Sequence, residues 1–319
     1  MPIKATQTIW FNGKLVPWEK ATVHVLTHAL HYGSSVFEGI RAYETPKGVA
    51  IFRLMDHTRR LFESARIYRL ELPFSEEQIN AACKAVIAVN GLSKGAYLRP
   101  LAFRGYGEIG VTPKVDPPTE VAIAAIEWGA YLGAEGLENG VDVCVSSWQR
   151  VAPNTIPAMA KAGGNYLSSQ LIGLEARRLG FAEGIGLTPD GLVSEGAGEN
   201  LFLVRDGVIY TPSFACSILG GLTRDTVIRL ARERGLEVRE ASIPREMLYL
   251  ADELFFAGTA VEVTPIRSVD RIRIGTGKRG PVTESLQRAF FGLFDGRTPD
   301  KWGWLEYVDM HAARTAATG

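Results

Sequence analysis

The chain has 319 residues, 46% of them hydrophobic, and its 35 basic and 35 acidic residues give a formal net charge of zero. A prior of about 150 residues per domain predicts roughly two domains, and the composition is typical of a globular chain with a buried core. Balanced charge argues against a global field that recruits nucleic acid or an anionic membrane. Small molecules and further copies of the chain are therefore the expected partners.

Three cysteines, Cys83, Cys144 and Cys216, are far apart in the sequence and odd in number. This spacing predicts core thiols in a reducing compartment instead of a disulfide framework or a thiolate metal site. Residues 1–7 lack the apolar core of a signal peptide, and no apolar run approaches the ~20 residues that a membrane helix needs. We therefore expect a cytoplasmic protein without a membrane span.

Residues 1–132 mix strand and helix signals and predict an N-terminal α/β domain of the α+β kind. Asn12-Gly13 predicts a hairpin turn. Ser75 and Gln78 form a capping box for a helix that Gly91 ends. Further strands are expected over residues 49–54, 97–104 and 121–131, and a helix through Leu61, Phe62, Ala65 and Tyr68.

Residues 133–136 are small and unpatterned, and they predict an interdomain loop. Strand signals dominate the C-terminal domain expected over residues 137–319. Its predicted strands cover residues 141–148, 185–187, 200–204 and 208–210, and its predicted helices cover residues 166–179 and 223–234. Gly180 and Gly235 end the two helices.

Two glycine patterns and three histidines offer other chemistry. Residues 105–110 and 275–280 both fit G-x-G-x-x-G, which binds dinucleotides only where it joins a strand directly to a helix. The first runs into a proline-rich stretch and the second meets Pro281, so both predict turns. His24, His28 and His31 lie where a strand is expected to enter a turn, which predicts structural histidines with backbone partners and no metal site.

Lys161 lies within residues 158–164, a run of small residues that offers its ammonium group neither a charged partner nor a solvated face. Desolvation disfavours the ammonium form of a lysine, and a neutral amine attacks carbonyl carbon. Lys161 is therefore a candidate Schiff-base nucleophile. The alternative is a solvated loop lysine.

Two further segments suit an anionic or a cationic ligand group. Residues 220–225 place two glycines directly before a predicted helix. The exposed backbone N–H groups and the Thr223 hydroxyl could therefore bind an anion together, a site called here an anion cup. The alternative is a plain loop with a threonine N-cap. Residues 258–260 are small enough for a second cup. Glu195 and Glu199 lie among small residues in a connection between strands, where one carboxylate suits a protonated ring nitrogen and both also suit solvated turn charges.

These segments, in this order, resemble the class IV (fold-type IV) pyridoxal-phosphate aminotransferases, and in particular the bacterial branched-chain amino acid enzymes. The motifs are long, independent and spread over nearly the whole chain. They comprise residues 28–33, 36–41, 97–100, 152–157, 160–166, 194–202, 221–225, 258–260 and 301–304. The resemblance implies two domains, with a smaller α/β N-terminal domain and a larger, β-barrel-like C-terminal domain that carries helices and binds pyridoxal 5'-phosphate.

The resemblance implies a role for each matching residue. Lys161 would hold the cofactor covalently and would move the proton between the substrate Cα and the cofactor C4′. Glu195 would pair with the ring nitrogen of the cofactor, and Tyr166 would form a hydrogen bond with its phenolic oxygen. The phosphate would be held by Arg60, Leu222, Thr223 and Thr259. Substrate would be bound by Tyr32, Phe37, Tyr97, Trp128, Tyr131, Thr259 and Ala260, and by Ile109 and Val111 from a neighbouring subunit. Because side chains alternate along a strand, Tyr97 and Arg99 are expected to share a face, and Arg99 is the candidate partner for the side-chain carboxylate of glutamate, with a structural ion pair as the alternative.

The activity implied is transamination of L-leucine, L-isoleucine and L-valine with 2-oxoglutarate. The implied minimal unit is a homodimer, and further assembly of dimers into a hexamer is left open. D-amino-acid transamination and aminodeoxychorismate cleavage by the same fold are the enzymatic alternatives, and a silent cofactor-binding regulator is the third. Tyr97 with Arg99, and residues 258–260, favour the first. Tyr106, Glu108 and Val261 depart from the family pattern and bear on substrate range.

Overall fold

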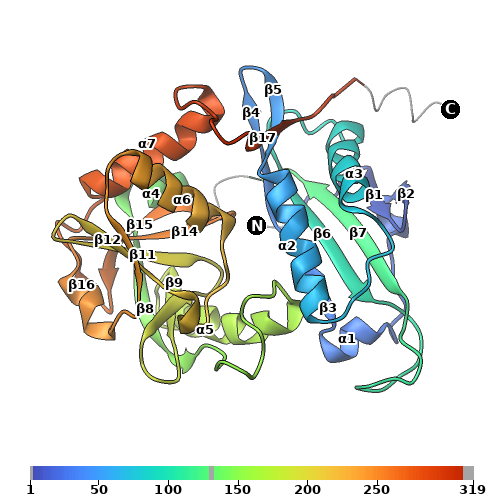
Figure 1. Cartoon of the computed structure of the whole chain (residues 1–319), viewed down its shortest axis with the longest axis horizontal. Helices are drawn as coiled ribbons and strands as arrows, with labels where there is room; N and C mark the ends of the chain where they lie inside the picture. The colour runs from blue at the N-terminus through green and yellow to red at the C-terminus, as the bar shows by residue number, and fades with distance from the viewer. Residues whose placement is uncertain (1–2, 129–132, 312–319) are drawn as a thin grey trace. The chain divides into compact units, whose positions relative to one another are not determined.

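The computed structural model describes residues 3–128 and 133–311, whose contacts group into two compact units (Figure 1). The first unit comprises Met1–Trp128, Ala160–Gly164 and Phe294–Gly319, and the second comprises Gly129–Met159 and Asn165–Leu293. The expected mixed α/β class is confirmed. Two segments, residues 160–164 and 294–311, pack with the first unit although the sequence predicted contiguous domains.

The first unit contains an eight-stranded sheet in the order β17-β5-β4-β6-β7-β1-β2, with β3 pairing with β6. Helices α2 and α3 lie along this sheet (Figure 1). The strands are β1 Thr8–Phe11, β2 Lys14–Pro17, β3 Ser35–Phe37, β4 Ile40–Thr45, β5 Gly48–Phe52, β6 Ala96–Arg104, β7 Thr119–Ile126 and β17 Leu305–Tyr307. The helices are η1 Trp18–Lys20, α1 His28–Tyr32, α2 Leu54–Ile67 and α3 Glu76–Val89.

Local sequence signals account for several of these boundaries. Asn12 and Gly13 have φ angles of 46° and 90° and form the turn between β1 and β2, as predicted. The Ser75 side chain accepts the Gln78 N–H while the Gln78 side chain accepts the Ser75 N–H, which confirms the capping box of α3. The strand predicted over residues 49–54 ends at Phe52, because Leu54 opens α2.

Residues 21–27 form no strand, and His28 begins the short helix α1, so the strand expected around the histidines is wrong. Their predicted backbone partners are confirmed. The Leu26 N–H donates to His24 Nδ1 at 3.1 Å, His28 Nε2 lies 2.9 Å from the Gly110 carbonyl, and His31 Nε2 lies 2.8 Å from the Val25 carbonyl.

The second unit contains a mixed nine-stranded sheet in the order β10-β9-β8-β15-β14-β11-β12-β13, with β16 pairing with β15. Its strands are β8 Val141–Gln149, β9 Glu183–Leu187, β10 Val193–Gly196, β11 Asn200–Arg205, β12 Val208–Pro212, β13 Val238–Ala241, β14 Glu253–Gly258, β15 Glu262–Val269 and β16 Ile272–Arg273. Its helices are α4 Gly133–Asn139, α5 Tyr166–Arg178, η3 Phe214–Cys216, α6 Leu222–Glu233, η4 Arg245–Leu250 and α7 Pro281–Asp295, the last two residues of α7 belonging to the first unit.

Helix α4 corrects one sequence prediction, whereas the turn predicted over residues 275–280 is confirmed. The loop expected over residues 133–136 lies within α4. Pro281 does not prevent a helix: it is the first residue of α7, a position where proline needs no N–H donor. The Glu253 carboxylate occupies the start of α7, accepting the N–H groups of Val282 and Thr283 at 2.9 and 2.8 Å. This anion occupies the place that a dinucleotide phosphate would need.

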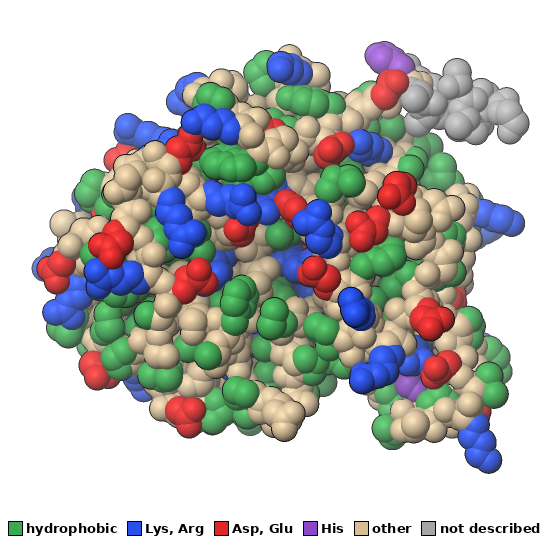
Figure 2. Space-filling view, viewed as in Figure 1, with side chains coloured by type: hydrophobic (Ala, Val, Ile, Leu, Met, Phe, Trp, Pro, Cys, Tyr) green, Lys and Arg blue, Asp and Glu red, His purple; other side chains and the backbone are tan. Residues whose placement is uncertain are grey.

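Each unit has its own core. Ala160 and Ala162 join the core of the first unit, and the stacked rings of Phe202 and Phe255 lie 4.9 Å apart in the second. All three cysteines are buried free thiols, as predicted. Acidic and basic side chains are interspersed over the face drawn in Figure 2. Among the described residues, no helix combines the length and apolarity needed to cross a membrane.

Candidate active site

Lys161 is fixed by its backbone on both sides. Its N–H donates to Ser64 Oγ at 3.0 Å, and its carbonyl accepts the Phe37 N–H at 2.9 Å. Ala160 and Ala162 are each 2% exposed. The small residues seen in the sequence therefore anchor the lysine segment in the core of the first unit, because a larger side chain at either position would not fit this packing.

The side chain of Lys161 belongs to a cluster of cations and aromatic rings. Its Nζ lies 5.0 Å from the Phe37 ring centroid, and the Arg99 guanidinium lies 4.6 Å from the same centroid. Arg99 donates to the Tyr97 hydroxyl at 3.1 Å, which confirms that Tyr97 and Arg99 share a face. Trp128 stacks on Tyr97 at 4.6 Å. Five predicted site residues thus lie together in the first unit.

Gly39 makes room for the end of the Tyr97 ring. A Cβ atom at Gly39 would lie 2.0 Å from the Tyr97 hydroxyl oxygen and 2.8 Å from its Cζ. The ring must therefore move if any side chain is introduced at Gly39.

We expect Gly39→Ala to displace Tyr97 and to lower the free energy of unfolding by about 1–3 kcal/mol, the usual cost of overpacking. The midpoint of thermal unfolding measures this loss. Gly173→Ala is the matched control, because a Cβ atom there meets only Ala197 Cβ at 3.8 Å and replaces a glycine within α5. Equal midpoints for Gly39→Ala and the wild type would contradict the close approach to Tyr97.

Glu38 is a buried carboxylate that the sequence reasoning did not single out. Arg60 donates to it twice, from Nε to Oε1 and from Nη2 to Oε2, each at 2.7 Å. His57 Nδ1 lies 2.7 Å from Oε2. Burial raises the pKa of Glu38, but Arg60 and His57 outweigh burial and hold that pKa well below its usual range. A glutamate between the apolar pair Val36-Phe37 and Gly39-Ile40 was the available signal.

The same contacts separate the two adjacent arginines of α2. Arg60 is 8% exposed and its guanidinium orientation is fixed by Glu38. Arg59 has a side chain that is 62% exposed, and it pairs with Asp56 at 3.4 Å. Arg60 is therefore the arginine with a preorganised side chain.

The loop between β6 and β7 presents apolar side chains to solvent. Ile109 is 60% exposed and Val111 is 82% exposed, and Tyr32 in α1 is 40% exposed. The contact between His28 and the Gly110 carbonyl ties this loop to α1. Tyr131, the remaining predicted pocket residue, lies outside the described residues.

Glu195 in β10 has a cationic partner. Arg150 Nη2 donates to its Oε1 at 2.6 Å, and Asn200 Nδ2 and the Leu219 N–H donate to its Oε2 at 3.0 Å each. Glu195 and Arg150 are each 6% exposed. A buried guanidinium and two neutral donors favour the ionised carboxylate. Asn200 lies within residues 194–202, one of the motifs that carry the family resemblance, whereas no local pattern identified Arg150.

Glu199 has a different environment, although it is also 6% exposed. Burial and then the carboxyl group of Glu183 raise its pKa, and the Gly198 N–H donates to its Oε2 at 3.0 Å. Neither Glu195 nor Glu199 is the solvated turn charge that the sequence left open. The two differ because Glu195 has a cationic partner and Glu199 has an acidic one.

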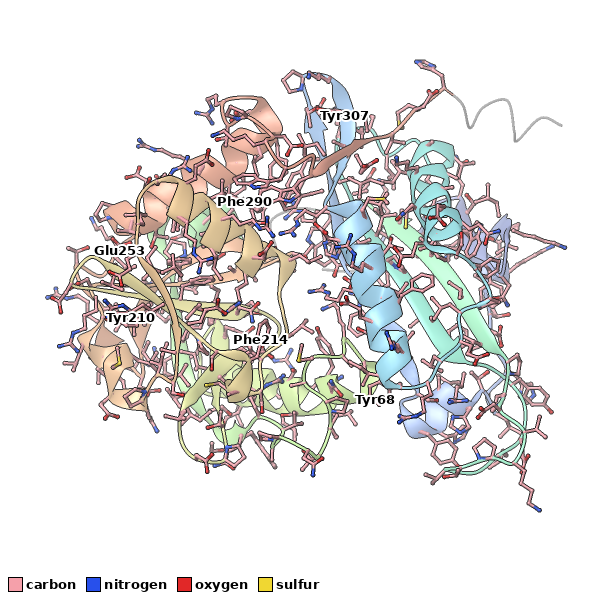
Figure 3. All side chains as sticks on the ribbon, in the orientation of Figure 1. Tyr68, Tyr210, Phe214, Glu253, Phe290 and Tyr307 are labelled. Carbon is pink, nitrogen blue, oxygen red and sulfur yellow. The ribbon has the colours of Figure 1, made fainter. Side chains whose placement is uncertain are left out.

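Helix α6 begins as the anion cup requires. Gly221 is its N-cap, so Leu222 and Thr223 are the first helical residues, and Thr223 does not serve as the N-cap. A Cβ atom at Gly221 would lie 2.0 Å from Asn200 Oδ1, which explains why the backbone there needs glycine. Phe214, labelled in Figure 3, packs near the preceding Gly220. The first-turn N–H groups and the helix dipole favour an anion at this end.

The two remaining predicted residues of the second unit lie at the ends of elements. Thr259 and Ala260 form the half-buried turn between β14 and β15. Tyr166 opens α5 after Asn165, whose side chain donates to the Pro157 carbonyl at 3.0 Å. Val261, the departure noted after this turn, is 3% exposed and packs in the core of the second unit.

The first unit thus presents a lysine amine among aromatic rings, and the second presents a buried carboxylate beside a helix N-terminus. A family model for class IV amino-transferases matches residues 35–269. The chain therefore belongs to the class IV aminotransferase family.

Within this family, the chain is similar to branched-chain amino acid aminotransferases. The branched-chain-amino-acid aminotransferase of Escherichia coli strain K12 is 58% identical over 310 residues, which cover 97% of this chain and 100% of that protein. A crystal structure of the Escherichia coli enzyme matches with a TM-score of 0.94 over 96% of this chain and 100% of that one, at 58% identity. The branched-chain amino acid aminotransferase of Thermobaculum terrenum, solved in its PLP form, matches with a TM-score of 0.89 at 36% identity, over 95% of this chain and 99% of that one.

Proposed function

We propose that this chain is a pyridoxal-phosphate-dependent aminotransferase that moves the amino group of L-leucine, L-isoleucine or L-valine to 2-oxoglutarate. Membership of the class IV family supports the reaction type. The named relatives at 58% and 36% identity support the branched-chain substrates. The observation that carries the proposal is the fixed Lys161 segment, with its amine 5.0 Å from the centroid of the Phe37 ring.

The described residues fit pyridoxal phosphate on chemical grounds. Lys161 supplies a primary amine for the aldehyde, the buried Glu195 carboxylate suits a protonated ring nitrogen, and the N-terminus of α6 suits a phosphate. When bound, the cofactor supplies a carbonyl for the amino group and a protonated ring that withdraws electrons from the substrate Cα. Lys161 Nζ would also be the base that takes the proton from the substrate Cα.

Other residues bind and orient. Glu195 holds the proton on the ring nitrogen, with Arg150 and Asn200 keeping the carboxylate ionised and in place. Tyr166 donates to the phenolic oxygen. Arg60 is held in one orientation by Glu38 and serves the phosphate. The remaining phosphate ligands are Leu222, Thr223 and Thr259.

The substrate is bound by its two ends. Tyr97 and the backbone of Thr259 and Ala260 take the α-carboxylate. An apolar side chain lies against aromatic rings, which exclude water from the reacting carbon. The ring set comprises Phe37, Tyr32, Trp128 and Tyr131, with Trp128 stacked on Tyr97 in support.

Single additions of amino acids to the cofactor-loaded protein test the proposal. L-leucine, L-isoleucine and L-valine should each convert the absorption spectrum of the cofactor in a first half-reaction, and 2-oxoglutarate should restore it. Conversion by D-amino acids alone would assign the D-amino-acid reaction instead. If no amino acid changed the spectrum, the chain would instead be a cofactor-binding protein without transaminase activity.

One pocket must accept both leucine and glutamate, and Arg99 is the cation that we expect to meet the γ-carboxylate of glutamate. Losing this charge-assisted contact in Arg99→Ala should cost about 1.5–3 kcal/mol, roughly a tenfold to hundredfold loss in kcat/KM for glutamate. Leucine carries no such carboxylate and should be largely spared. The two half-reactions, measured separately, test this difference.

Arg59→Ala is the control for Arg99→Ala, because Arg59 is an exposed arginine whose side chain pairs with Asp56. It should leave both half-reactions unchanged. Equal damage to leucine and glutamate in Arg99→Ala would assign Arg99 to support of Phe37 and Tyr97.

A homodimer is the expected minimal unit, supported by the exposed apolar side chains of Ile109 and Val111, which are expected to reach a neighbouring subunit's pocket. Tyr106 and Glu108 lie in the same loop, where Glu108 accepts the Val115 N–H at 3.1 Å. The expected cytoplasmic location is compatible with the three buried free thiols.

A further inference from the structure

Two buried acids meet in the second unit without a cation between them. Glu183 in β9 is 8% exposed and Glu199 is 6% exposed, and the carboxyl group of Glu183 raises the pKa of Glu199 directly. Within residues 3–128 and 133–311, neither carboxyl group forms an ion pair with a basic side chain. Two ionised carboxylates in such contact repel strongly in a buried setting.

The available donors leave one position that only a proton fills. The Gly184 N–H donates to Glu183 Oε1 at 2.7 Å. The Gly198 N–H donates to Glu199 Oε2. Glu199 Oε1 is buried, and no N–H or O–H group of the described residues donates to it. A carboxyl O–H on Glu199 that donates to Glu183 satisfies both side chains.

Glu199 belongs to the turn that separates Glu195 from Asn200. The Gly196 N–H donates to the Glu199 carbonyl at 2.8 Å, which closes the turn. A Cβ atom at Gly196 would lie 2.9 Å from Glu199 Oε1, so the turn closes tightly around this side chain. Asn200, the next residue, donates to Glu195.

We propose that Glu183 and Glu199 share one proton and act as a positioning pair, which holds the 196–199 turn so that Asn200 and Arg150 keep Glu195 aligned. The importance of this alignment for catalysis rests on the proposed function, in which Glu195 serves the cofactor ring. The shared proton itself does not depend on that function.

The electrostatics agree with this geometry. Burial first, and then the negative charge of Glu183, raise the pKa of Glu199 well above its ordinary value. Burial also raises the pKa of Glu183. The other groups with electrostatic contacts to the pair are Glu195 and the thiol of Cys144 on β8, while Arg150 is committed to Glu195 and Ser169. One proton on the pair reduces the negative charge beside Glu195.

Infrared spectroscopy tests the shared proton directly. At neutral pH the wild type should show the C=O stretch of a protonated carboxylic acid, which shifts in D2O. Glu199→Gln and Glu183→Gln should each lose this band, because an amide N–H replaces the proton and the remaining acid is ionised. Glu253→Gln is the control, since Glu253 is a buried carboxylate that accepts N–H groups at the start of α7. A wild-type spectrum without the band, or a band that both variants keep, would overturn the shared proton.

The dependence of stability on pH is a second test of the same proton. The folded chain keeps this proton above the ordinary glutamate pKa of about 4.3, whereas the unfolded chain loses it. Folding stability must therefore fall as pH rises from that value through the raised pKa of the pair. Glu199→Gln lacks this dependence, so the difference between its unfolding midpoint and that of the wild type should shift in favour of the variant as pH rises above about 4.3. A constant difference between the two would contradict the proposal.

Kinetics and cofactor spectra test the positioning role. Glu199→Ala should lower kcat about tenfold to a hundredfold with a smaller change in KM, and should shift the cofactor spectrum in the same direction as Glu195→Gln. Glu199→Gln should recover much of the rate. A Glu199→Ala protein with the wild-type spectrum and rate would overturn the positioning role. An unaltered Glu195→Gln protein would instead reject the proposed role of Glu195 and leave the infrared result standing.

Discussion

Lys161→Ala should abolish turnover with every amino acid. The variant loses both the amine that binds the cofactor covalently and the base that moves the proton, and a positioned base alone contributes about 10²–10⁴-fold. The neighbouring structure should survive, because Lys161 is held through its backbone and the core residues on either side are alanines. Stopped-flow measurement of the first half-reaction with L-leucine checks this expectation.

Lys47→Ala is the matched control for Lys161→Ala. Lys47 is an exposed residue between β4 and β5 in the same unit, so its loss should leave the half-reaction unchanged. Normal turnover in Lys161→Ala would remove this lysine from the chemistry altogether.

Glu195→Gln should retain the cofactor and lose most of the rate, by about a hundredfold or more, which corresponds to at least ~2.7 kcal/mol in the barrier. A glutamine cannot keep a proton on the ring nitrogen by pairing with its charge, so the substrate carbanion is stabilised less. The phosphate ligands are untouched, so binding of the cofactor should persist. Single-turnover rates and equilibrium dialysis with the cofactor measure the two properties.

Glu199→Gln separates the two carboxylates in the same assay. Because Glu199 pairs with the acid Glu183 whereas Glu195 pairs with the cation Arg150, the amide substitution at Glu199 should be milder than that at Glu195. A crippled Glu199→Gln protein beside a nearly normal Glu195→Gln protein would reverse the assignment of the two residues.

Local signals predicted the elements whose boundaries depend on local chemistry. The Asn12-Gly13 turn and the Ser75–Gln78 capping box form because neighbouring residues satisfy the backbone there. The turn predicted over residues 275–280 forms, but no local pattern predicted helix α7, which begins directly after it at Pro281. Its N-terminal acceptor, Glu253, comes from a strand far earlier in the sequence.

In the candidate site, too, local spacing predicted only the contacts between residues that are close in the sequence. Tyr97 and Arg99 were predicted to share a face, since they are two residues apart on one strand. The partners Glu38 for Arg60 and Arg150 for Glu195 are 22 and 45 residues away from them in the sequence. Such pairs depend on tertiary packing, which no local pattern encodes. Lys161 likewise packs with the first unit although its segment lies between stretches of the second.

The most direct test of the central claim is reduction of the cofactor-loaded protein with borohydride, followed by peptide mapping. Borohydride fixes a cofactor that is bound to a lysine amine. The account predicts one labelled peptide, the one that contains Lys161, and no label on Lys47 or Lys301. A label on another lysine, or a cofactor that reduction leaves entirely free, would contradict it.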